Sequence, residues 1–141
     1  MTLDFGQVNW LPAIVGGVAY FAIGAVWFTP MAFGKAWQRS IGWDPVATPP
    51  EMKPTTYVVP LIAYIVAAVA TAMLAAATGS DTLSEGLTLG LVVGIGFAVP
   101  LTVTEATFDP NKPAPWTWWV ITAAYHVVGL LLVAVIVSVW V

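Results

Sequence analysis

Four long stretches without a charged side chain dominate this 141-residue sequence. They are 30, 27, 19 and 29 residues long and cover residues 5–34, 54–80, 86–104 and 113–141. A helix of about 20 apolar residues is long enough to cross the ~30 Å hydrocarbon core of a bilayer. Inside lipid the backbone must satisfy its own hydrogen bonds, and continuous apolar runs do this as helices rather than as barrel strands. The sequence therefore predicts four membrane-spanning helices.

The composition agrees with this prediction and excludes several kinds of chemistry. Only 8% of the residues are charged, whereas soluble domains carry about 25%. Because the chain has no cysteine, it can form neither disulfides nor cysteine metal sites. A net charge of −3 without a basic cluster argues against a nucleic-acid partner. One histidine and scattered carboxylates make a metal site improbable, and we expect no cofactor and no enzymatic activity.

We expect an all-α membrane protein with one domain over residues 1–141, a bundle of four transmembrane helices at about 9–28, 57–78, 83–107 and 115–140. Between the first two helices, aromatic and aliphatic residues recur four apart within 31–43, which predicts a short helix in the membrane interface. Prolines at 45, 49, 50 and 54 predict an extended loop after it. Thr82 and Glu85 form a predicted capping box, and Pro100 predicts a kink that the hydroxyls of Thr102 and Thr104 could satisfy.

Lysine and arginine predict the orientation, because they favour the cytoplasmic side in short loops. Lys35, Arg39 and Lys53 lie in the first loop and Lys112 lies in the third. Four helices place these two loops on the same face. We therefore expect a cell membrane protein with cytoplasmic loops at 29–56 and 108–114 and with both termini outside.

The tryptophans fall near the expected helix ends, where indole prefers the headgroup zone. We interpret all eight as membrane-interface anchors: Trp10 and Trp140 on the outer side, and Trp27, Trp37, Trp43, Trp116, Trp118 and Trp119 on the inner side.

Small residues recur every four positions in two of the expected helices. Lipid provides no hydrophobic force between helices, so close backbone approach at small residues carries their association. We expect the two stripes to face each other across the hairpin that joins the helices, and to build the monomer core rather than an oligomer interface. The stripes are Ala63, Ala67, Thr71 and Ala75 on one helix, and Gly86, Gly90, Gly94 and Ala98 on the next.

His126 and Glu105 are the ionisable candidates for an intramembrane polar site, since a buried ionisable group is by default functional. His126 lies ~15 Å along the last helix at ~1.5 Å per residue, near the midplane. Glu105 lies within a turn of the inner end of its helix and can reach the headgroups. Tyr20, Tyr64 and Tyr125 complete the candidate set. For His126 we favour a helix-to-helix hydrogen bond over a proton relay or ligand contact.

The first loop carries a recognisable motif. Asn9 and Trp10 open the first helix, Gly24 lies within it, residues 27–30 read Trp-Phe-Thr-Pro, and residues 33–37 read Phe-Gly-Lys-Ala-Trp. The last helix contains Tyr125 and Gly129 and closes with Trp140. In these features the chain resembles a family of small bacterial membrane proteins known as domain of unknown function 1761. The resemblance implies a membrane location and four helices but no activity, and Thr122 stands where family members carry Asn.

Two functions remain open. The favoured hypothesis is a structural or accessory membrane protein, either self-associating or attached to a larger membrane complex. The alternative is a small-solute or proton transporter or channel, with a polar path around His126, Tyr20, Tyr64 and Glu105.

Overall fold

The fold, described here from a computed structural model that covers residues 3–51 and 53–140, consists of helices and connecting loops in this part of the chain. Four spans confirm the predicted bundle, each long and apolar enough to cross a membrane. Two short elements accompany them, the 3-10 helix η1 (Phe5–Gln7) and helix α2 (Gly34–Ser40). The spans are α1 (Trp10–Trp27), α3 (Thr55–Thr78), the continuous α4 (Leu83–Val93), η2 (Gly94–Ala98) and α5 (Val99–Phe108), and α6 (Pro115–Val139).

The turn between α3 and α4 forms as its sequence predicts. Gly79 adopts the left-handed conformation at φ +66°, which glycine does without steric cost, and the Ser80 N–H returns to the Ala75 carbonyl at 2.9 Å. The Thr82 hydroxyl accepts a hydrogen bond from the Glu85 N–H, and the Glu85 carboxylate accepts one from the Thr82 N–H. This capping box satisfies two donors of the first turn of α4.

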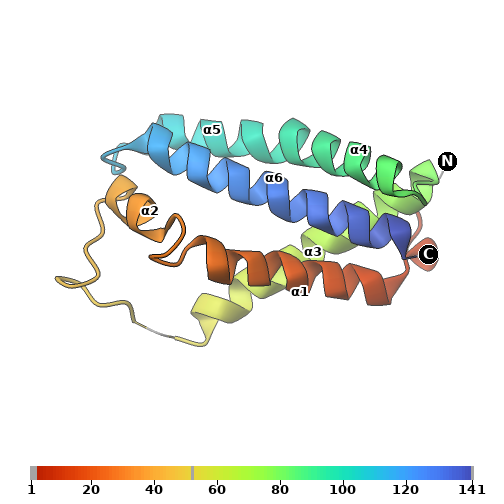
Figure 1. The fold of residues 1–141 in the computed structure, drawn as a ribbon, viewed down its shortest axis with the longest axis horizontal. Helices are drawn as coiled ribbons and strands as arrows, with labels where there is room; N and C mark the ends of the chain where they lie inside the picture. The colour runs from red at the N-terminus through yellow and green to blue at the C-terminus, as the bar shows by residue number, and fades with distance from the viewer. Residues whose placement is uncertain (1–2, 52, 141) are drawn as a thin grey trace.

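The elements segregate to the two ends of the bundle (Figure 1). One end holds both termini of the described chain and the turn between α3 and α4. The opposite end holds α2, the proline-rich loop and the turn between α5 and α6. Lys35, Arg39, Lys53 and Lys112, the four basic residues of the chain, therefore all lie at the α2 end.

Helix α6 is the central helix of the bundle. It packs against α1, α3 and the α4–α5 span, whereas α3 makes few contacts with α4. In the most apolar stretch of α6, 50% of the residues are buried, compared with 22% in α3 and in α4–α5. The last helix thus holds the other three together.

The expected pairing of the two small-residue stripes is wrong. The three glycines of the stripe face α6 and not α3: a Cβ atom on Gly90 would lie 2.6 Å from the Leu131 Cα, and one on Gly94 would lie 3.1 Å from the Val127 Cα. Gly86 approaches Ser138 of α6 in the same way. A short turn brings α3 and α4 together at one end only, and the backbone of α6 then occupies the place expected for α3.

The stripe on α3 is also only partly correct. Thr71 and Ala75 are buried and Ala67 is half-buried, but Ala63 is exposed. Ala68 and Ala72 are the additional buried positions of this helix. The buried face is therefore rotated from the predicted one, because α3 packs against α1 and α6 together and crosses both of them.

Helix α2 is shorter than the predicted interfacial helix at 31–43. A compact turn precedes it, in which the Gly34 N–H donates to the Thr29 carbonyl at 2.9 Å. A Cβ atom at Gly34 would lie 2.2 Å from the Phe28 carbonyl oxygen, so glycine is needed for this turn. The Ala114 N–H donates to the Ser40 carbonyl and ties α2 to the start of α6.

A π-helical segment, η2, interrupts the span in which Pro100 predicts a kink. Pro100 lies in the first turn of α5, directly after η2. It has no N–H, so it cannot donate a backbone hydrogen bond to the preceding turn. The hydroxyls of Thr102 and Thr104 donate to the carbonyls of Ala98 and Pro100, so they do not reach the carbonyls left free before the proline. The break is thus accommodated by widening the helix.

Candidate functional site

The centre of the bundle holds a cluster of one imidazole and three phenols. The Tyr20 hydroxyl lies 2.5 Å from Nδ1 of His126, which joins α1 to α6. The Tyr20 ring lies flat against α6 because Gly129 has no side chain: a Cβ there would lie 2.1 Å from the ring. Tyr20 is 2% exposed and His126 is half-buried, so this hydrogen bond is partly buried.

Tyr125 and Tyr64 complete the cluster. The Tyr125 hydroxyl donates to the Tyr20 carbonyl at 3.1 Å, and Gly24 allows this approach because a Cβ there would lie 2.8 Å from that hydroxyl. Tyr64 of α3 stacks on Tyr20 with ring centroids 4.2 Å apart. The rings of Tyr64 and His126 lie 6.4 Å apart. Four of the five predicted polar-site residues thus come together from three helices.

Glu105, the fifth predicted residue, pairs with a lysine outside this cluster. Its carboxylate pairs with the Lys112 ammonium at 3.3 Å, at the turn between α5 and α6, and its side chain is 58% exposed. The Lys112 side chain is only 7% exposed, bonds also to Asp109, and lies 4.2 Å from the centre of the Trp118 ring. This lysine fixes the turn by joining two carboxylates to one aromatic ring.

The same ion pair changes the acidity of Asp109. The hydrogen bond from Lys112 and a second one from the Asn111 N–H hold the pKa of the Asp109 carboxyl below its usual value. Asp109 therefore stays ionised at neutral pH, as the turn requires.

An aromatic groove opens beside the cluster, between α1 and α3. Its volume is about 430 Å³, and Gly24, Ala25 and Pro60 form part of its wall. The rings that line it are those of Phe21, Phe28, Trp37, Tyr57, Tyr64 and Tyr125. Tyr64 and Tyr125 belong to both the cluster and the groove, so an occupant of the groove would contact the cluster directly.

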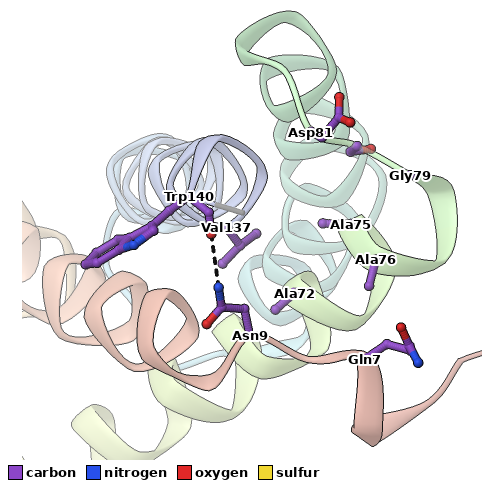
Figure 2. A pocket seen from close by; sticks show the side chains of 10 residues that line it. Gln7, Asn9, Ala72, Ala75, Ala76, Gly79, Asp81, Val137 and Trp140 are labelled. Atoms are coloured by element: carbon purple, nitrogen blue, oxygen red, sulfur yellow. Dashed lines mark hydrogen bonds between the residues drawn. The ribbon is translucent and has the colours of Figure 1, made fainter.

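A smaller pocket of about 150 Å³ lies at the opposite end of the bundle (Figure 2). Asn9, Asp81 and Trp140 are among the residues that line it. The Asn9 side-chain amide donates to the Trp140 carbonyl at 3.2 Å, and this hydrogen bond ties the start of α1 to the end of α6. The pocket is small, and the hydrogen bond across it serves to close the bundle at this end.

The tryptophans lie at helix ends, but two of them make contacts that an anchor role does not explain. Trp118 is 6% exposed and packs against Lys112, so it does not face lipid. The Trp27 ring N–H donates to the Ile121 carbonyl and joins α1 to α6. Trp10 and Trp116, by contrast, are exposed at the two ends. Sequence position alone did not separate these roles.

Among the described residues, no group of three or more histidine, aspartate or glutamate side chains is placed to hold a metal ion. The contacts within the cluster are hydrogen bonds and stacked rings. The cluster can hold or pass a proton between Tyr20 and His126, and the groove can bind a ring.

Comparison with known protein families gives a match over most of the chain. A family model described as protein of unknown function (DUF1761) matches residues 11–138. The chain belongs to this family. No curated protein and no solved structure shows a significant match. The match to the DUF1761 family covers all four spans apart from Trp10 and Val139, and it includes both the cluster and the groove.

The groove is the part of the site that sequence reasoning missed. Its aromatic residues come from α1, α2, α3 and α6, and only the crossing of these helices brings them together. A partial signal was present in α1, where Phe21, Gly24 and Phe28 recur on one face at three- and four-residue spacing.

Proposed function

We propose that this member of the DUF1761 family is a non-catalytic structural or accessory membrane protein that associates with transmembrane helices of other proteins, including further copies of itself. The observation that carries the proposal is an outward face of α3 that the bundle leaves uncovered. Val59 and Val66 are 62% and 63% exposed, and Ala63 and Ala70 between and beyond them are also exposed.

The spacing along this face supports helix pairing. Val59, Ala63, Val66 and Ala70 follow one another at intervals of four, three and four residues, which is the repeat of a left-handed helix pair. Alanine allows close backbone approach, and close packing is what stabilises helix pairs in lipid. Ala63 was expected in the monomer core, and its exposure leaves it available to a partner helix.

We further propose that the α2 end of the bundle is cytoplasmic and that the termini are outside. This orientation is supported by the placement of all four basic residues at the α2 end. Helix α2 then lies at the inner surface of the cell membrane.

Cysteine crosslinking in native membranes tests the association, because the chain has no cysteine of its own. We expect Ala70→Cys to form a disulfide-linked dimer or an adduct with a partner. Ile95→Cys is the matched control, since Ile95 is also exposed, 55%, but lies on η2. Monomers alone from Ala70→Cys, with no copurifying protein, would contradict the proposal, as would equal crosslinking of the two variants.

A second candidate, a proton or small-solute path around His126, is favoured by one observation. The aromatic groove and the small end pocket lie at opposite ends of the bundle, and residues of α3 and α6 line both. Tyr64 and Tyr125 of the cluster line the groove, and the residues of α3 and α6 that line the end pocket follow them along each helix. A pH-sensitive dye inside proteoliposomes tests this candidate: His126→Leu should abolish proton entry driven by a pH gradient, and unchanged entry excludes the role.

A further inference from the structure

We propose that the aromatic groove binds a quinone-class lipid, meaning a molecule with an uncharged planar ring that carries carbonyl oxygens and with an isoprenoid tail. This inference is independent of helix association through α3. It rests on the walls, the polar groups and the position of the groove.

The walls of the groove suit a planar ring. Six aromatic side chains line it, and Gly24 and Ala25 keep one side free of bulk. Aromatic rings favour stacked or edge-on contacts with other rings at centroid distances of ~4.5–7 Å. A volume of about 430 Å³ falls within the ~300–1,000 Å³ of typical small-molecule pockets. A ring and the first part of a tail fit this space.

The polar side chains of the groove are all neutral. They are the hydroxyls of Thr56, Tyr57, Tyr64 and Tyr125 and the indole N–H of Trp37. The hydroxyls of Thr56 and Tyr64 and the indole N–H of Trp37 can donate hydrogen bonds, and a quinone carbonyl is an acceptor without charge. The Tyr125 hydroxyl already donates to the Tyr20 carbonyl, so it offers its oxygen as an acceptor. Pro60 has no N–H to give to the Thr56 carbonyl one turn earlier, so that carbonyl offers an acceptor to a ring hydroxyl, as in a quinol.

The charges nearby argue against a phospholipid headgroup as the occupant. Lys35 and Arg39 line a different pocket, which also contains Asp44 and shares no residue with the groove. Within α2 these two side chains point away from Trp37, because residues two positions apart lie on opposite sides of a helix. No Lys or Arg side chain is among the described residues that line the groove, so a phosphate there would have no cation in the groove wall to pair with.

The depth of the groove fits a lipid-soluble ring. Tyr57 lies in the first turn of α3, and Tyr64 lies ~14 Å from the start of that helix at ~1.5 Å per residue. The groove therefore runs from the expected membrane boundary toward the midplane. A ring would lie against Tyr64 and Tyr125 with its tail leaving between α1 and α3 into the hydrocarbon.

Titration calorimetry with the purified protein in detergent micelles tests the inference, with decylubiquinone as the probe. We expect saturable binding by the wild-type protein. Ala25→Leu should fill the groove and weaken binding by about tenfold or more, which corresponds to about 1.4 kcal/mol. Ala22→Leu is the matched control, because Ala22 is exposed on the same helix but does not line the groove. It should bind like the wild type.

Tyr64→Phe keeps the ring but removes the hydroxyl, and we expect it to weaken binding by about fivefold. Helix content measured by circular dichroism verifies that each variant is folded. Equal, non-saturable uptake of decylubiquinone by the wild type and Ala25→Leu would overturn the inference. Displacement of the quinone by short-chain phosphatidylglycerol at equal concentration would also overturn it, because the groove would then hold acyl chains in general.

Discussion

The Tyr20 hydroxyl and Nδ1 of His126 lie 2.5 Å apart, and they form the polar side-chain contact between α1 and α6 at the centre of the bundle. An interhelical hydrogen bond of this kind in a membrane contributes about 0.6 kcal/mol on average and up to about 1.7 kcal/mol. The pair is enclosed by aromatic rings, so water does not readily replace a lost partner.

We therefore predict that Tyr20→Phe and His126→Leu each destabilise the protein by about 1–2 kcal/mol, because each leaves one polar group unpaired. The double variant should lower the free energy of unfolding by less than the sum of the losses in the two single variants. Unfolding by SDS in mixed micelles, followed by circular dichroism, provides the four free energies. Additive effects would mean that the hydrogen bond contributes nothing.

Close packing between α4 and α6 gives a second prediction. Gly90→Ala should destabilise the protein by about 1–3 kcal/mol, since a Cβ there meets the backbone of Leu131. Gly96→Ala is the matched control, because no atom lies within 4 Å of its Cβ position. It should leave stability unchanged or raise it slightly, as alanine favours helix more than glycine does. The same SDS unfolding assay compares the two variants.

The turn between α5 and α6 gives a prediction on pH. The pKa of Asp109 is depressed in the folded protein, so its contribution to stability is present above the unfolded value of about 3.9 and is lost as the pH falls through the lower folded value. Lys112→Gln removes the charged hydrogen bond and should raise the pKa of Asp109 toward normal. Carboxyl carbon NMR with labelled aspartate measures this shift, and an unchanged pKa in Lys112→Gln would contradict the assignment.

Much of the fold could be predicted from the sequence, because its signals are local. Uncharged runs located the four spans, and Thr82 with Glu85 located the start of α4, since both signals act within one or two turns. The partners of the helices could not be predicted in the same way. Gly86, Gly90 and Gly94 indicate a close contact but not the identity of its partner, and the residues of α6 that they contact lie more than 30 positions further along the chain.

The candidate site shows the same division. His126 could be predicted as a site residue because it is the single histidine in an apolar chain. Tyr20 and Tyr64 were added to the candidate site as nearby polar groups. Glu105 was grouped with His126 because both side chains are ionisable. The end of its helix lies beside Lys112, however, and the Glu105 carboxylate pairs with that ammonium group. The groove depends on how α1 crosses α3, and no local pattern encodes that crossing.

The proposed orientation is tested by labelling intact cells with a membrane-impermeant maleimide. Ser80→Cys in the turn between α3 and α4 should be labelled from outside, and Thr48→Cys in the proline-rich loop should be labelled only after lysis. The reverse pattern would place the termini in the cytoplasm.

Helix α4 and segment η2 pack against α6, which leaves the outer face of α3 uncovered and forms the bundle around α6. A Cβ at Gly94 would lie 3.5 Å from the Val127 Cβ, within the ~3.5–4.5 Å range of disulfides. The most direct test is oxidation of Gly94→Cys/Val127→Cys with copper phenanthroline, compared with Gly94→Cys/Ala67→Cys, which joins the two stripes at equal distance from the turn. We predict an intramolecular disulfide in the first pair and none in the second, and a disulfide in the second pair alone would mean that η2 packs against α3 and not against α6.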